Sequence, residues 1–497
     1  MMQQLSFLPD IKVEKNLTRN HFSHDGVCQE NARIALDAHY ADLFEETNKF
    51  NRQLVSFQAN KTEVLHSWMK YREGFSANLV ELLLDELGIA PGDIILDPFA
   101  GSATTLLAAK MRGIDAIGIE ILPHCHLAWL AKSKAFDYDL DELRYLRGLL
   151  EQTTPPATET RFPHLTITET AFPPETEREL MAYTEWFETL AISQTTKTLG
   201  KMLLMSLLEE ISYTRKDGQY LRWDSRAGKI QKNNEKRISQ GKKPIRGIDK
   251  GQLPTLKPLL LEKLNRIIID VAKLQRDPLP PGRQTLENGS ALYSLPAMAA
   301  NQFSGVITSP PYANRYDYTR TYALELAYLS VDNEIFDLRQ NQLSCTVENK
   351  SKTEALEQFY GTIGQTARYQ QIIEIIEQNA ALSEINDALA IRHERGDVNN
   401  RGILAMINQY FTELTFIFAE LHRTCRSGAG VIFVNDNVRY AGEVIPVDTM
   451  STRLAEAVGF LPEKIYVLPQ RKGNSSQQMG KFGREALRKS ITVWKKP

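Results

Sequence analysis

Cysteine is scarce in this sequence, and a long apolar run is missing altogether. Only four of the 497 residues are cysteines, and they lie far apart without any CxxC pair. Such spacing indicates neither a zinc site nor a disulfide framework, and it is typical of a reducing compartment. No apolar run reaches the roughly 18 residues of a membrane span, and the first residues lack a signal-peptide layout. We therefore expect a cytoplasmic protein with no membrane segment and no metal.

Net charge is also small, but it is distributed unevenly. The formal net charge of −2 does not by itself indicate a polyanionic partner. Between Thr214 and Gly251, however, twelve basic residues stand against four acidic ones, and from Pro469 to the end eight stand against one. Such segregation is a footprint for phosphate, although two solvated faces explain it as well. The pattern leaves both readings open.

The apolar pattern predicts an α/β fold. Residues 76–88 form an amphipathic helix with Ser76 as its N-cap. Short buried strands at 93–97 and 115–120 flank a helix at 104–112, which makes one strand–helix–strand unit. Further strand candidates are 285–290, 305–309, 429–435, 464–468 and 490–494. Together these segments predict a doubly wound sheet of about seven strands.

Two insertions interrupt the α/β pattern. Proline-rich hinges at 153–158 and 278–282 bracket a block of distinct composition, as expected for an inserted domain. We therefore divide the chain into an N-terminal extension (1–60), a first core part (61–150), a basic insertion (151–283), a second core part (284–332), a helical insertion (333–400) and a third core part (401–497).

A loop of small residues follows the first core strand. Its sequence is Asp97-Pro-Phe-Ala-Gly-Ser-Ala-Thr-Thr105. Small residues let the backbone approach a ligand, and the helix that follows presents free N–H groups. Glu120 ends the next strand, where a carboxylate can hold both hydroxyls of a ribose. A loop of this kind is common, but together with Glu120 it indicates an adenosine-type cofactor.

A second motif, Thr308-Ser-Pro-Pro-Tyr312, follows a later strand. Ligands of open α/β sheets bind at this edge, and two consecutive prolines cannot continue a strand ladder. The Ser309 hydroxyl and the Pro310 carbonyl can accept the hydrogens of an exocyclic amine, while the Tyr312 ring can stack on a planar base. Taken alone, the motif is equally compatible with a strand-ending turn.

Together the two motifs resemble the fingerprints of the DNA amino-methyltransferases, D-P-F-x-G-S-G-T-T and [DNS]-P-P-[YF]. The resemblance implies a seven-stranded Rossmann-like sheet with helical and irregular insertions, which binds S-adenosyl-L-methionine. The cofactor-binding residues that it implies are Tyr71, Phe75, Ser76, Asp97, Phe99, Ala100, Gly101, Ser102, Thr104, Glu120, Asn288 and Ser290. The catalytic residues that it implies are Ser309, Pro310, Pro311 and Tyr312. The chain departs from the pattern at Ala103, where the family has glycine, and it lacks the aspartate that usually contacts adenine.

The resemblance also bears on the substrate. Serine at the place of Ser309 goes mostly with cytosine N4 in this family, so we expect N4 methylation of a base flipped out of double-stranded DNA. Adenine N6, an RNA base amine and a non-catalytic nucleic-acid-binding subunit are the alternatives. The basic insertion (151–283) is a candidate for recognition of the DNA target, with the helical insertion (333–400) as the alternative, and a polar run at 470–478 is a candidate for backbone contact. Whether a cognate restriction endonuclease accompanies the protein is left open.

Overall fold

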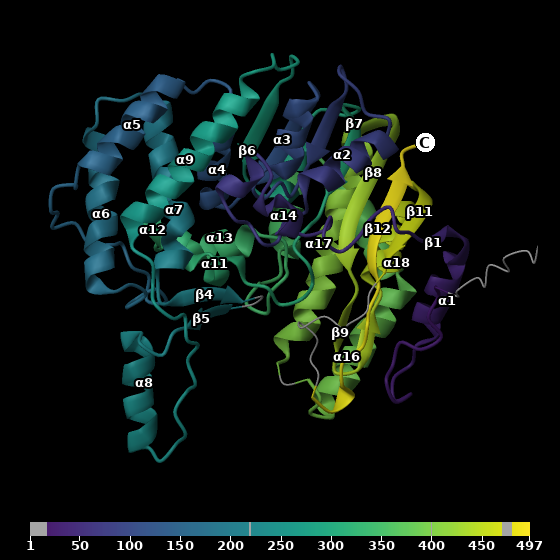
Figure 1. Ribbon diagram of the computed structural model, residues 1–497. Coiled ribbons are helices and arrows are strands. Elements are labelled where there is room, and N and C mark those ends of the chain that lie inside the picture. Colours follow the sequence, from purple (N-terminus) through teal and green to yellow (C-terminus); the bar gives the residue numbers. More distant parts are fainter. Residues whose placement is uncertain (1–16, 218–219, 399, 470–479) are drawn as a thin grey trace, which may run out of the picture.

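The computed structural model describes residues 17–217, 220–398, 400–469 and 480–497. The polar run at 470–478 therefore lies outside the described residues. Helices surround one large central sheet, and a small two-stranded hairpin with one projecting helix extends from the body (Figure 1). Within the described ranges, no helix is long and apolar enough to cross a membrane.

The central sheet has eight strands, one more than the sequence predicts. In spatial order they are β1 (Phe44–Glu46), β11 (Leu461–Leu468), β12 (Lys489–Lys495), β8 (Cys425–Asp436), β7 (Phe303–Thr308), β2 (Ile94–Asp97), β3 (Asp115–Glu120) and β6 (Gln284–Asn288). The five strands from β8 to β6 run parallel, whereas β12 is antiparallel to both of its neighbours. Each predicted strand segment overlaps one of these strands.

The eighth strand corrects the prediction of a seven-stranded sheet. Strand β1 comes from the N-terminal extension and pairs in parallel with the edge strand β11, with Phe44 opposite Ile465. It has only three residues, and Glu45 and Glu46 are both exposed. Such a segment lacks the alternation that marks a strand in a sequence. Its conformation is set by the free edge of β11 on which it lies.

Helices cover both faces of the sheet, as a doubly wound fold requires. Successive strand residues point to opposite faces, so Ile95 and Ile307 enter one buried cluster while Leu96 and Val306 enter the other. The first face carries α2 (Ala77–Glu86) and α3 (Thr104–Met111). The second carries α17 (Gly402–Thr424) and α18 (Val447–Ala457).

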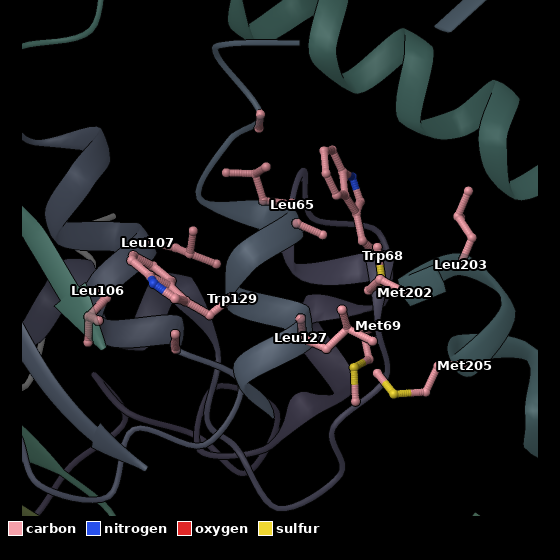
Figure 2. Packing of buried hydrophobic residues seen from close by; sticks show 14 of the residues in the cluster. Leu65, Trp68, Met69, Leu106, Leu107, Leu127, Trp129, Met202, Leu203 and Met205 are labelled. Carbon is pink, nitrogen blue, oxygen red and sulfur yellow. The ribbon is translucent and has the colours of Figure 1, made fainter. Parts of the chain in front are cut away.

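The helices of the basic insertion extend the first of these two cores. They are α6 (Pro174–Thr189), α7 (Gln194–Ile211) and α9 (Leu256–Leu274), beside α4 (Pro123–Lys132) and α5 (Leu140–Gln152). Figure 2 shows Met202 and Met205 of α7 beside Met69 and Leu127, all in one buried cluster. The insertion therefore shares its core with the first core part. The six-segment division of the chain stays a prediction.

The remaining elements lie around the sheet and its two helix layers or, in the case of β4, β5 and α8, extend from the body (Figure 1). The 333–400 block is helical, as predicted. The elements are α1 (Asn31–His39), α10 (Ala291–Ser294), α11 (Tyr318–Thr321), α12 (Ala323–Tyr328), α13 (Ile335–Asn341), α14 (Thr353–Thr362), α15 (Thr366–Glu377), α16 (Ala380–Glu394), the hairpin β9 (Val438–Tyr440) and β10 (Glu443–Ile445), the hairpin β4 (Thr214–Asp217) and β5 (Tyr220–Trp223), and α8 (Gly228–Ser239).

Candidate active site

Four neighbouring parallel strands bring the two sequence motifs to one edge of the sheet. Strands β6, β3, β2 and β7 end at Asn288, Glu120, Asp97 and Thr308. Because the carboxyl ends of parallel strands share an edge, motifs more than 200 residues apart become neighbours there. The edge opens into a hollow, here called the central hollow, whose empty space counted out to solvent is about 730 Å³.

Most of the predicted site residues line the central hollow. They are Tyr71, Phe75, Asp97, Phe99, Ala100, Gly101, Ser102, Thr104, Glu120, Ser290, Ser309 and Pro311. Four predicted residues do not line it. Ser76 is buried, and its hydroxyl accepts the Leu79 N–H at 3.1 Å as the predicted N-cap of α2. Asn288 is exposed at the end of β6, and Pro310 and Tyr312 lie just outside the hollow.

Glu120 holds the floor of the central hollow together. Its carboxylate accepts the backbone N–H groups of Gly101 at 2.7 Å and of Ile121 and Leu122 at 2.8 Å. Burial raises the pKa of this carboxyl group, while the three N–H groups work in the opposite direction. Oε2 accepts only one of these bonds, so it retains a free lone pair. Glu120 can therefore both position the small-residue loop and accept a ligand hydroxyl.

Asp97 links the two motifs directly. Its carboxylate accepts hydrogen bonds from the hydroxyl of Thr105 at 2.6 Å, from the hydroxyl of Thr308 at 2.8 Å and from the backbone N–H of Phe99 at 3.1 Å. Burial raises its pKa to about 6 despite these donors. Asp97 thus fixes the small-residue loop to the residue that precedes Ser309.

Two residues of the small-residue loop have left-handed backbone conformations. Gly101 has φ +52°, and a Cβ atom there would lie 2.8 Å from Cε1 of Tyr71. Ala103 has φ +63° at the start of α3. An L-residue with a Cβ atom pays about 1–2 kcal/mol for this conformation, whereas glycine does not. This strain explains why the resembled family has glycine at the place of Ala103.

The second motif is supported by a lysine from the far end of the chain. The Ser309 hydroxyl donates to the Tyr312 hydroxyl at 3.2 Å. The Lys489 ammonium lies 5.2 Å from the centroid of the Tyr312 ring and pairs with Asp436 at 2.9 Å. Burial raises the pKa of the Tyr312 phenol, so the phenol is neutral at physiological pH. Sequence analysis counted Lys489 only as one cation of a basic segment.

Sequence analysis also missed part of the wall of the hollow. Glu73 lines it and accepts hydrogen bonds from the hydroxyls of Tyr316 and Tyr322. Glu73 lies between Tyr71 and Phe75, which the resemblance had already assigned to the cofactor site, so its place in the wall could have been predicted from the sequence. The segment 341–343 lines the hollow as well. It follows α13 in the helical insertion, and its sequence carries no signal for such a role.

The histidines of α4 have structural partners. His124 is buried and stacks on the Tyr322 ring at a centroid distance of 4.4 Å. His126 places Nε2 2.8 Å from the carbonyl oxygen of Glu120. In the part of the chain that the structure describes, no group of three or more His, Cys, Asp or Glu side chains has the arrangement of a metal site.

The cations of the basic segment between Thr214 and Gly251 include two sets, one held by the body of the protein and one on a projection from it. In the first set, Lys216 is buried and pairs with Glu325, and Lys250 donates to backbone carbonyls between the end of α7 and the start of β4, including that of Ser212 at 2.7 Å. The other set lies on residues 228–246, here called the basic arm. The arm projects from the body and consists of α8 and the irregular segment that returns from it (Figure 1). Its exposed cations are Lys232, Lys236, Lys242, Lys243 and Arg246.

The basic arm is held together locally. The Asn234 side chain exchanges two hydrogen bonds with the backbone of Ile245, at 2.6 and 3.1 Å, and Arg237 donates to the Lys243 carbonyl at 2.8 Å. At its outer end Ile238 is 62% exposed. The arm therefore presents a preformed, strongly cationic projection to solvent.

Comparison with known proteins agrees with this site. A family model described as DNA methylase matches residues 19–130, which include the small-residue loop and Glu120. The Type II methyltransferase M.BsoBI of Geobacillus stearothermophilus is 56% identical over 96% of this chain and 94% of its own length. The Type II methyltransferase M.AvaI of Nostoc is 38% identical over 98% of both chains. No solved structure matches.

These relatives cover nearly the whole chain, and the matched stretch includes both motifs and both insertions. The match with the family model falls on the segment that the site geometry singles out independently. The chain therefore belongs to the DNA amino-methyltransferase family, with Type II methyltransferases as its full-length relatives.

Proposed function

We propose that this protein transfers a methyl group from S-adenosyl-L-methionine to an exocyclic amine of a base in double-stranded DNA, with cytosine N4 as the target atom. Family membership supports methyl transfer. The observation that carries the proposal is that Glu120, the small-residue loop and Ser309 line one hollow, with Tyr312 at its margin. Cofactor and base would meet there.

The central hollow fits the cofactor. Glu120 can hold the ribose hydroxyls, and Ser290 lies at the end of β6, where the adenine ring is expected. A Cβ atom at Gly101 would lie 2.8 Å from the Tyr71 ring, so glycine is needed for the loop and this ring to pack together in the wall of the hollow. When bound, the cofactor supplies an electrophilic methyl group on a sulfonium. The chain then has to orient the acceptor, and alignment dominates the rate of such a reaction.

The second motif is suited to orient a base amine. The Ser309 hydroxyl uses its hydrogen on Tyr312, so its lone pairs are left to accept an N–H of the amine. The Pro310 carbonyl is the second acceptor, and the two prolines limit its movement. A target base must leave the duplex, at a cost of a few kcal/mol, and stacking on the Tyr312 ring offsets part of that cost.

Ser309 supports cytosine N4 as the target. The hydroxyl is a weaker acceptor than the Asp or Asn side chain that accompanies adenine N6 in the resembled family. Adenine N6 remains the second candidate, because both amines need the same two acceptors and the same stacking ring.

The basic arm supports DNA as the substrate. Its five exposed cations are free to contact phosphate, and such contacts supply most of the affinity for nucleic acid. The Type II methyltransferases among the relatives support a setting in a restriction–modification system.

Sequencing of modified bases in DNA from cells that express the protein tests the proposal. We expect N4-methylcytosine in one short motif. N6-methyladenine instead would overturn the target atom and keep methyl transfer to DNA. Absence of any modified base, together with no methyl transfer by the purified protein, would overturn the function.

Two variants of Tyr312 test the role of the ring. Tyr312→Ala should lower the methylation rate by roughly 10- to 100-fold, because stacking on an aromatic ring contributes about 1–3 kcal/mol per base. Binding of the cofactor, measured by calorimetry, should be unchanged because Tyr312 does not line the central hollow. Tyr312→Phe keeps the ring and is the matched control. Loss of cofactor binding in Tyr312→Ala would sink the assignment.

A further inference from the structure

A second hollow lies behind the wall of the central hollow. It is bounded by the turns η2 (Phe57–Lys61) and η3 (His66–Trp68), the end of α7, the start of β4 and the middle of α9. Its volume is about 420 Å³, which is ample for one or more phosphate groups. These elements come from four separate parts of the chain.

The second hollow is rich in cations that form no ion pair within the described part of the chain. Its unpaired cations are Lys61, Lys70, Arg215, Lys263 and Arg266, and we call the hollow with these five side chains the cationic groove. Within the described part of the chain, all of them except Lys263 form neither an ion pair nor a side-chain hydrogen bond. Two exposed carboxylates, Glu210 and Glu262, also line the groove. Five unpaired cations thus face two carboxylates.

The other charged residues of the groove are already engaged. Lys216 pairs with Glu325, and Glu209 accepts a hydrogen bond from the Arg72 guanidinium. Lys250 is occupied by the carbonyl groups at the end of α7. The excess positive charge of the groove is therefore not balanced by the fold.

Lys263 lies between the other cations of the groove and its two carboxylates, and its pKa is lowered mainly by burial. Its ammonium donates to the Ser206 hydroxyl at 2.6 Å. Burial lowers its pKa to about 8, and the positive charges of Arg266 and Lys70 add to the effect, although Glu210 opposes it. A bound anion would relieve the repulsion among these three cations. The groove therefore has both the space and the charge for an anionic ligand.

The cationic groove is separated from the central hollow by a single layer of side chains. The Lys216 ammonium at its floor lies 4.4 Å from the centroid of the Tyr322 ring. That ring stacks on Tyr71, at a centroid distance of 5.3 Å, and Tyr71 lines the central hollow. Arg72 spans the same layer and donates to the Lys216 carbonyl at 2.6 Å. An anion in the groove would thus lie behind the wall of the central hollow without entering it.

We propose that the cationic groove binds phosphate groups, and that the backbone of the substrate DNA beyond the methylated base is their source. The choice of DNA rests on the proposed function, whereas phosphate binding itself does not. The groove also lies next to β4, whose hairpin leads into the basic arm.

The double variant Lys70→Gln/Arg266→Gln of the full chain tests the proposal. DNA affinity is measured by fluorescence anisotropy at salt concentrations between about 50 and 200 mM. The affinity of the wild type for DNA falls as salt rises over this range. For each phosphate contact that the variant has lost, its own fall should be smaller than that of the wild type by roughly threefold. Cofactor binding and the methylation rate at saturating DNA should stay unchanged. Lys134→Gln/Lys273→Gln removes two cations outside the groove and is the matched control.

A second measurement separates the two sources of phosphate. Inorganic pyrophosphate should raise the melting temperature of the wild type and not that of the groove variant. If the groove variant binds DNA as the wild type does but is no longer stabilised by pyrophosphate, the groove binds phosphate, and its ligand is a small phosphate compound rather than DNA. Unchanged DNA binding and equal stabilisation of both proteins would overturn the groove as a site. If the wild-type protein methylates no DNA but pyrophosphate still stabilises it and not the groove variant, the proposed function is wrong and phosphate binding by the groove is still supported.

Discussion

Asp97 shows how one residue can serve the fold and the site at once. It receives hydrogen bonds from two motifs that are more than 200 residues apart in the chain, through Thr105 and Thr308. The sequence suggested only a cofactor contact for it. In the structure its oxygen atoms hold the strand ends β2 and β7 in register, and the hollow forms between them.

The raised pKa of Asp97 has a predictable effect on stability. Because the pKa is about 6 in the folded protein and ordinarily about 4, the charged carboxylate costs stability at neutral pH. That cost is relieved as the pH falls through 6 and is gone below about 4. Relative to Asp97→Asn, the wild type should therefore gain up to about 3 kcal/mol in free energy of unfolding between pH 7 and pH 4.

Chemical denaturation at several pH values measures this difference. Asp141→Asn, at an exposed position on α5, serves as the control for general effects of pH. A stability difference between wild type and Asp97→Asn that stays constant with pH would contradict the assignment of the raised pKa to Asp97.

Among the elements, the basic arm carries the clearest prediction for DNA binding. The triple reversal Lys236→Glu, Lys242→Glu and Arg246→Glu leaves the hairpin β4–β5 and the buried Lys216 untouched. It should weaken DNA binding. The plot of log affinity against log salt should also become less steep, by about 0.9 for each phosphate that is no longer bound. Reversal of Lys134, which lies away from the arm, is the control. Unchanged binding would move DNA recognition to the helical insertion (333–400).

The N-terminal extension is joined to the body through a buried ion cluster. Glu443 of β10 is 1% exposed and accepts hydrogen bonds from Arg33 of α1 at 3.1 Å, from Arg392 of α16 at 2.8 Å and from Ser23 at 2.9 Å. Without the charge of Glu443, the buried guanidinium groups of Arg33 and Arg392 keep only the partners nearer the surface, so their charge is less well compensated. The cluster therefore fixes α1, and with it β1, against the rest of the fold.

Glu443→Gln tests the strength of this connection. It should lower the free energy of unfolding by about 3–5 kcal/mol, as measured by denaturant titration. Glu463→Gln is the control, because its pair with Lys495 is about half exposed on both sides and such pairs contribute less than about 1 kcal/mol. Equal effects of the two substitutions would argue against the buried cluster as an anchor of the extension.

At the scale of the whole molecule, one hydrophobic core runs from the sheet into the basic insertion. Leu106 of α3, Leu127 of α4 and Leu203 of α7 belong to the same buried cluster (Figure 2). An apolar helix face that packs on another part of the chain is exposed to water when that part is removed. The insertion therefore depends on the first core part for its stability.

A fragment of residues 151–283 should accordingly not fold on its own. We expect it to show no cooperative unfolding by circular dichroism and ready proteolysis. The fragment 61–283, which keeps α4 and α5, is the comparison and should retain more helix. Cooperative unfolding of the shorter fragment would show that the insertion is an independent domain.

The local order of the sequence determined much of the fold and the chemistry. Alternating or continuous apolar runs predicted the strands that became β2, β3, β6, β7, β8, β11 and β12, because burial on a sheet demands such patterns. Small residues after β2 and the Ser309-Pro-Pro-Tyr312 motif identified both halves of the candidate site. These signals are local, so they are readable without knowing what packs on them.

Other features were decided only in three dimensions. Strand β1 exists because a free sheet edge accepts it, and the segment 341–343 reaches the hollow because α13 packs beside α11. Lys489 meets Tyr312, and Lys70 meets Lys263 and Arg266, across long stretches of chain. Charge and aromatic contacts of this kind depend on distance in space, and distance in space follows from the packing of the whole chain rather than from any local pattern.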